Sequence, residues 1–125
     1  MSNIGLPLIS GNADTTKETV ILIHGMMRTG RSMRRIGEHL ACHGYNIVNC
    51  SYESTKTVNE ITDELFFALT PIIEAAPKVH FVTHSLGGII LRNAFKDKAP
   101  SNIGNVVMYG PPNRGCQHID HFSWL

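Results

Sequence analysis

Short apolar runs rich in β-branched residues alternate along this chain with segments of helical periodicity, and this alternation strongly constrains the fold. The expected strands are residues 20–23, 45–50, 79–82 and 105–109. The first of them is apolar at every position, as in a strand covered by helices on both faces. Strand–helix–strand units joined by right-handed crossovers build a parallel sheet. The sequence therefore predicts an α/β fold with a doubly wound, mainly parallel sheet of about four strands flanked by helices.

Three segments between the strands have the apolar spacing of amphipathic helices. They are residues 32–43, a segment that starts after Thr57, and residues 85–95. Gly44 follows the first segment, where a left-handed helix stop favours glycine. Thr57 and Glu60 have the spacing of a capping box at the start of the second. Pro71 lies inside the second segment and costs a helix interior about 3 kcal/mol, so we expect a kink or an early end near Thr70.

Composition argues against several classes of protein. A formal net charge of +1 gives no reason to expect nucleic acid or an anionic membrane surface as a partner. The apolar N-terminal residues have no basic flank and are interrupted by Gly5 and Pro7, so they do not resemble a secretory signal. No apolar run reaches the roughly 20 residues that a membrane span needs. The three cysteines, Cys42, Cys50 and Cys116, match neither a disulfide framework nor a zinc site. We expect a soluble, reduced, cytoplasmic protein.

The turn after the third expected strand has the pattern of a nucleophile elbow. There the sequence reads THSLGG over residues 83–88. A serine on such a tight, strained turn has its hydroxyl lifted above the edge of the sheet, and the residues two before and two after it must be small. Gly87 meets this need, whereas Thr83 stands where the common pattern has glycine. The backbone N–H of Leu86 would then face a substrate oxyanion at the start of the helix. The alternative is that Ser85 is a plain helix N-cap.

The residues after the first strand fit an oxyanion loop. Gly25 permits a sharp turn, so that the N–H of Met26 can point at the oxyanion beside that of Leu86. His24 is either a proton shuttle or, more commonly for a histidine at a strand end, a partner for backbone hydrogen bonds. The side chains of Met26 and Met27 fit an acyl pocket or plain core packing equally well.

Together these motifs resemble the lipase and esterase branch of the α/β-hydrolase superfamily. The resemblance covers about residues 18–116 and rests on His24 with Gly25, on the elbow with His84, Ser85 and Gly87, and on residues 110–115. It matches the four strands with the third to sixth strands of eight in the family. It implies attack of Ser85 on a small-molecule ester or lipid through an acyl-enzyme, with Met26 and Leu86 as oxyanion donors. It also implies that no cofactor takes part.

The family's catalytic acid and base are not evident in this sequence. In the family they follow the serine, acid first and histidine second. Only the residues from 86 to 125 follow Ser85, so we expect a single, incomplete α/β-hydrolase domain over residues 1–125. Asp120 with His118 or His121, in a loop after the fourth strand, is the remaining triad candidate. The stronger alternative is that this tail begins a lid or a helix.

Two further expectations follow from an incomplete sheet. Residues 106–109 would form an exposed edge strand, and such an edge favours pairing with a second copy, so we expect a homodimer through it.

The alternative to an active esterase is a catalytically silent relative that binds a small apolar ligand or a protein partner. A flavodoxin-like nucleotide-binding domain is a weaker alternative, because no glycine-rich phosphate loop follows the first strand. His39 and His43 have a metal-binding spacing without a third ligand, so no metal site is expected.

Overall fold

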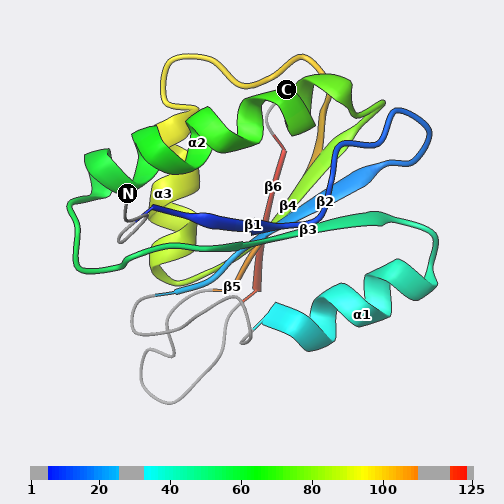
Figure 1. The fold of residues 1–125 in the computed structure, drawn as a ribbon, viewed down its shortest axis with the longest axis horizontal. Helices are drawn as coiled ribbons and strands as arrows, with labels where there is room; N and C mark the ends of the chain where they lie inside the picture. The colour runs from blue at the N-terminus through cyan, green and yellow to red at the C-terminus, as the bar shows by residue number, and fades with distance from the viewer. Residues whose placement is uncertain (1–5, 26–32, 110–118, 124–125) are drawn as a thin grey trace.

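The computed structural model describes residues 6–25, 33–109 and 119–123, the last of these by backbone only. In this part of the chain, six strands form one sheet and three helices cover it (Figure 1). In chain order the elements are β1 (Leu8–Ser10), β2 (Thr19–Ile23), α1 (Arg34–Cys42), β3 (Asn46–Ser51), α2 (Val58–Ala75), β4 (Val79–His84), α3 (Leu86–Ala94), β5 (Ile103–Tyr109) and β6 (Ile119–Ser123).

The sheet is mainly parallel, as predicted. Its strand order is β1-β3-β2-β4-β5-β6. The four inner strands run parallel, and β1 and β6 pair antiparallel at the two edges. Helices α2 and α3 cover one face of the sheet, and α1 covers the other (Figure 1). The carboxyl ends of the parallel strands therefore meet at one edge, which is where α/β folds hold their ligands.

The two faces of β2 explain why its sequence is apolar throughout. Ile21 and Ile23 are fully buried in the core cluster beneath α2 and α3. Val20 and Leu22 are buried in the second cluster, against α1. Because successive side chains of a strand point to opposite faces, a strand between two helical layers has no solvent-facing position. This central position also fixes where the loop after β2 must lie.

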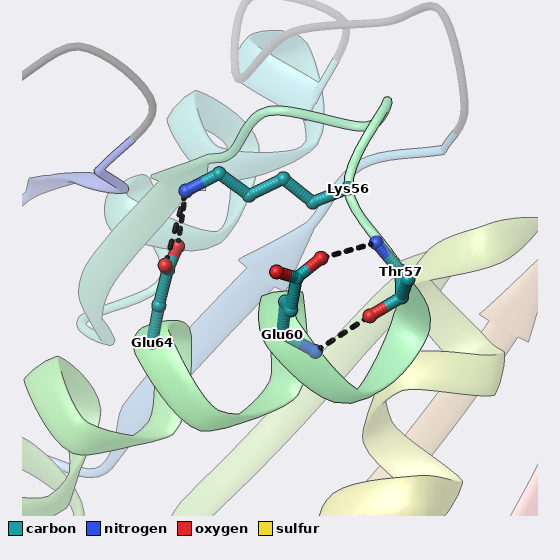
Figure 2. A network of polar contacts seen from close by, with 4 residues as sticks. All are labelled: Lys56, Thr57, Glu60 and Glu64. Atoms are coloured by element: carbon teal, nitrogen blue, oxygen red, sulfur yellow. Dashed lines mark hydrogen bonds and ion pairs between the residues drawn. The ribbon is translucent and has the colours of Figure 1, made fainter.

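The start of α2 is the predicted capping box (Figure 2). The Thr57 hydroxyl accepts a hydrogen bond from the Glu60 N–H at 3.1 Å, and the Glu60 carboxylate accepts one from the Thr57 N–H at 3.0 Å. The backbone hydrogen bond from Thr57 is the main reason why the pKa of Glu60 lies below 4.5. Beside it, the Lys56 ammonium contacts the Glu64 carboxylate at 2.8 Å. The cap sets the direction of the helix that covers most of one face.

Of the kink or early end expected near Thr70, the early end is wrong, because α2 continues to Ala75. A proline removes the hydrogen bond to the carbonyl four residues earlier, which here belongs to Phe67. Both Pro71 and Phe67 are exposed, so water can satisfy that carbonyl. The buried residues Leu69, Ile72 and Ile73 hold the helix on the core on either side of the proline.

The helix stop at Gly44 is confirmed. Gly44 has a φ of +91°, and its N–H donates to the carbonyl of Ala41. The N–H of Tyr45 donates to the carbonyl of Leu40. These two bonds form a Schellman motif, which satisfies carbonyls at the end of α1 and turns the chain into β3.

Three expectations about the C-terminal part of the chain are wrong. Residues 106–109 are not an edge, because β6 pairs with β5 over the register Asn105 to Tyr109. Asp120 and His121 lie on this strand and not in a loop, and residues 119–123 form a strand and not the start of a helix. The pairing with β6 satisfies hydrogen-bonding groups of β5 that an exposed edge would leave unpaired. The homodimer predicted through residues 106–109 therefore loses its structural basis.

No helix among the described residues combines the length and the apolar character that a bilayer crossing requires.

Candidate active site

Ser85 has an unusual backbone conformation at the turn between β4 and α3. Its φ is +51° and its ψ is −116°, and no other described residue except glycine has a positive φ. Such strained conformations cost about 1–3 kcal/mol and persist only where the surroundings impose them. The Ser85 N–H donates to the carbonyl of Tyr109 at 2.9 Å, and its carbonyl accepts from the Gly88 N–H at 2.9 Å. The turn is therefore held from β5 on one side and from α3 on the other.

The Ser85 hydroxyl does not cap the helix that it precedes. Ser85 is the N-cap residue of α3, but its side chain makes no capping hydrogen bond. The plain N-cap interpretation is therefore wrong, because a capping serine accepts a hydrogen bond from the first turn. Ser85 as a whole is half-buried. Leu86, the first residue of α3, is buried beneath it.

Gly87 is the small residue that this turn requires. A Cβ atom at this position would lie 2.8 Å from the carbonyl oxygen of His24, and closer still to that of Ile23. Both are backbone atoms at the end of β2, so neither can move away as a flexible side chain would. On the other side of the elbow, Thr83 is fully buried, and its hydroxyl has no hydrogen-bond partner among the described residues. The elbow therefore accommodates a threonine where the common pattern has glycine.

Gly25 brings the end of β2 into contact with the elbow. A Cβ atom on Gly25 would lie 3.1 Å from the Cβ of Ser85 and 2.8 Å from Nδ1 of His84. The contact follows from the sheet, because β2 and β4 are neighbours and Ile23 pairs with Thr83. The sequence placed Ser85 and Gly25 after strands of one parallel sheet, and the structure brings them side by side. Met26 and Met27 lie outside the described residues.

His24 is a buried residue that binds the backbone and is not free to carry protons. The Tyr52 N–H donates to its Nε2 at 3.2 Å, so Nε2 is an acceptor and the ring proton is on Nδ1. That proton is donated to the carbonyl of Gly25 at 2.7 Å. Burial lowers the pKa of His24 below 6.5, and the bond to Gly25 opposes this in part. The structure therefore favours the second interpretation of His24, as a partner for backbone hydrogen bonds.

Tyr52 is a residue of this site that the sequence did not reveal. It follows β3, and its ring stacks on that of His24 with centroids 4.0 Å apart and planes 7° from parallel. Its hydroxyl donates to the carbonyl of His24 at 2.6 Å. Burial raises the pKa of the Tyr52 phenol well above its usual value. The one feature of the sequence that could have identified Tyr52 as a site residue is its position just after an expected strand, at the same edge of the sheet as Ser85.

The expected triad candidates are only partly described. His118 lies outside the described residues, and Asp120 and His121 are described by backbone alone. In the register of the sheet, Asp120 pairs with Met108 and His121 with Val107. The N-terminal end of β6 pairs with Tyr109, whose carbonyl binds the Ser85 N–H. The N-terminal end of β6, at Ile119, therefore lies at the edge of the sheet where Ser85 lies.

Other chemistry-bearing groups lie elsewhere. Among the described residues, no three histidine, cysteine or acidic side chains come together as a metal site. Nδ1 of His43 donates a hydrogen bond to the carbonyl of His39, which lies in the last turn of α1. Cys50 is buried, and burial raises the pKa of its thiol far above the ordinary value, so it is not a reactive thiolate. A groove of about 1000 Å³ lies between α2 and residues 93–102, and none of the elbow residues lines it.

The fold was compared with known proteins. No protein-family model and no curated protein matches this chain. Among solved structures, a carboxylesterase from Nitrososphaera gargenis superposes with a TM-score of 0.67 at 18% identity, over 85% of this chain and 42% of the esterase. The esterase EaEST from Exiguobacterium antarcticum gives 0.66 at 14% identity, over 86% of this chain and 41% of that one. Epoxide hydrolase A from Mycobacterium thermoresistibile gives 0.56 at 20% identity, over 70% and 30%.

The chain thus spans less than half the length of the structures that it matches. Those structures are hydrolytic enzymes, and another match is described as an α/β hydrolase from a deep-sea metagenome. The resemblance expected from the sequence is confirmed at the level of the fold. This chain has the fold of the α/β-hydrolase superfamily.

Proposed function

We propose that this chain is the nucleophile-bearing part of a serine hydrolase that acts on carboxylic esters through an acyl-enzyme at Ser85. One observation carries the proposal. Ser85 is held in a strained turn at the carboxyl edge of the sheet, its hydroxyl does not cap α3, and Gly25 lies against its Cβ. A strained conformation that the surroundings impose on a residue, in a place where ligands bind, favours a functional role over a structural one.

The chemistry follows from what surrounds the hydroxyl. The Ser85 oxygen attacks the ester carbonyl, and negative charge develops on the carbonyl oxygen. The N–H of Leu86, at the N-terminus of α3, is one donor to this oxyanion, and the helix dipole favours charge there. The N–H of Met26, which follows Gly25, is the second donor. The alcohol leaves, an acyl group stays on Ser85, and water then releases it as a carboxylic acid.

The base that accepts the Ser85 proton is proposed to be His118, just before β6, or His121, on β6, with Asp120 as the candidate acid. The support is that the start of β6 lies at the edge of the sheet where Ser85 lies. His24 does not serve as this base, since both of its ring nitrogens are engaged by the backbone and burial lowers its pKa. A base must lie within about 2.6–3.2 Å of the hydroxyl, or reach it through one water.

The substrate proposed is a small ester or a lipid ester. Structures with this fold include esterases, which supports ester chemistry, although the same fold also occurs in epoxide hydrolases. A serine hydroxyl at the elbow favours acyl transfer, because an acyl group on a hydroxyl is itself an ester that water can cleave.

A fluorophosphonate probe tests the nucleophile directly. The wild-type chain should be labelled covalently at Ser85, as read by mass spectrometry of the intact and digested protein. Ser85→Ala should abolish the labelling. Ser101→Ala, at an exposed serine in the turn before β5, is the matched control and should leave it unchanged. Failure of the folded wild-type protein to react would refute the proposal and favour a silent relative that binds a small apolar ligand or a protein partner.

A further inference from the structure

Tyr52 and His24, which directly follow the neighbouring strands β3 and β2, contact each other in three ways. The Tyr52 backbone N–H binds Nε2 of His24, and the Tyr52 hydroxyl binds the carbonyl of His24. Between these two bonds the rings stack almost parallel. Backbone, ring and hydroxyl of Tyr52 thus all contact one residue. These contacts restrain both the ring and the carbonyl of His24.

The restraint extends from His24 to the residue that touches Ser85. Because Nε2 accepts the Tyr52 N–H, the ring proton must be on Nδ1, and it is donated to the carbonyl of Gly25 at 2.7 Å. A peptide group is planar, so a bond that holds its carbonyl oxygen also fixes the plane of its N–H, which belongs to the next residue along the chain. Gly25 in turn lies against the Cβ of Ser85. The chain of contacts runs from Tyr52 through His24 and Gly25 to Ser85.

Glycine makes this restraint necessary. Gly25 has no side chain with which to anchor itself, and glycine has more backbone freedom than any other residue. An oxyanion donor is effective only where it is held in place before the reaction, since a donor that must reorganise loses much of its benefit. The His24 ring and the carbonyl bond from Tyr52 supply the missing anchor from outside the loop.

We propose that Tyr52 is a positioning residue for the reaction at Ser85, acting through His24 to hold the Gly25 peptide against the elbow. This inference rests on the proposed function. Tyr52 does not touch the substrate. It accelerates acylation by holding the Gly25 carbonyl, and with it the plane of the peptide whose N–H is the proposed second oxyanion donor. Its loss therefore lowers the rate of the chemical step and leaves binding of the probe unchanged.

The variant Tyr52→Phe separates positioning from packing. It removes only the bond from the hydroxyl to the His24 carbonyl, and it keeps both the ring stack and the backbone bond to Nε2. One neutral hydrogen bond corresponds to about a five-fold effect. The maximal inactivation rate of the fluorophosphonate should therefore fall about five-fold in Tyr52→Phe, with the half-saturating probe concentration unchanged within about two-fold.

Hydrogen exchange supplies a readout that does not depend on activity. Loss of the hydroxyl should speed amide exchange in residues 20–25 about five-fold, because local opening there becomes easier, while exchange in α2 stays the same. Tyr45→Phe, at the opposite end of β3, is the matched control and should change neither the inactivation rate nor the exchange of residues 20–25.

The outcomes distinguish this inference from the proposed function. A labelled wild type with Tyr52→Phe reacting at the wild-type rate overturns the positioning role and leaves the nucleophile intact. Unchanged exchange in residues 20–25 also overturns it. A wild type that is not labelled overturns the proposed function and, with it, the catalytic role of Tyr52. A lower maximal rate with unchanged half-saturation and faster exchange supports the inference.

Discussion

The substitution Gly87→Ala tests whether close contact between α3 and the end of β2 forms the elbow. The added Cβ would lie 2.8 Å from the carbonyl oxygen of His24 and still closer to that of Ile23. Ordinary contact begins at 3.4 Å, so these backbone groups must retreat by roughly 0.6 Å or more. Because β2 lies in the middle of the sheet, it cannot retreat without disturbing its pairing with β3 and β4.

Two opposing effects determine how far Gly87→Ala changes the free energy of unfolding. Overpacking costs typically about 1–3 kcal/mol, and a clash with backbone of a central strand belongs at the upper end. Replacing glycine by alanine in a helix returns up to about 1 kcal/mol. The free energy of unfolding should therefore fall by about 2 kcal/mol in Gly87→Ala. Labelling of Ser85 should fall as well, since the displaced carbonyls belong to the residues that precede Gly25.

The neighbouring glycine provides the control. A Cβ on Gly88 would meet only side-chain atoms, the Thr83 hydroxyl at 3.2 Å and the Met108 sulfur at 3.3 Å. The helix gain and these tight contacts should nearly cancel, so Gly88→Ala should stay within about 1 kcal/mol of the wild type. Urea unfolding followed by circular dichroism measures both variants. Equal stability of Gly87→Ala and Gly88→Ala would refute the argument from close contact.

Two further predictions concern buried polar groups at the site. Thr83→Val should raise the free energy of unfolding by about 1 kcal/mol in urea, because the Thr83 hydroxyl is buried without a partner among the described residues; a loss of stability would show that it is paired. Stability should fall as the pH drops below 6.5, since burial lowers the pKa of His24 in the fold and the unfolded chain then binds the proton more readily. The loss between pH 7.5 and 5.5 should be smaller in His24→Gln, and equal losses in both proteins would contradict this assignment.

The central part of the fold could be predicted from the sequence because it is marked by local signals. The run at residues 20–23 is apolar on both faces, which only an inner strand of a layered sheet requires, and β2 is found at Thr19–Ile23. The capping box at Thr57 and the glycine stop at Gly44 likewise depend on residues within a few positions of each other. Such features need no knowledge of the partner strands.

The two edge strands were missed because nothing local defines them. β1 has only three residues and becomes a strand by pairing with β3, far along the chain. β6 contains Asp120 and His121 between apolar residues, and a sequence of this kind is extended only because β5 offers an unpaired edge. Pro71 was misjudged for a related reason. Whether a proline ends a helix depends on the exposure of the released carbonyl, which only the folded structure gives.

Only part of the candidate site could be predicted from the sequence. Ser85 and Gly25 could be placed at one edge, because parallel strands end together. Tyr52 could not be linked to His24, because their contact requires β2 and β3 to be neighbours, with Ile23 opposite Cys50. Strand order is a property of the whole chain, and no single segment of the sequence determines it.

The pairing of Ile23 with Thr83 has a consequence for how the molecule reaches its native state. Gly25 and the turn before α3 meet only when β4 pairs with β2, and α1, β3 and α2 lie between these two strands in the chain. Closing a long loop costs chain entropy before any contact repays it, so such distant pairings form slowly. During synthesis, the serine and the glycine that lies against it emerge separately. The Ser85–Gly25 pair therefore depends on a contact between segments that are distant in the sequence.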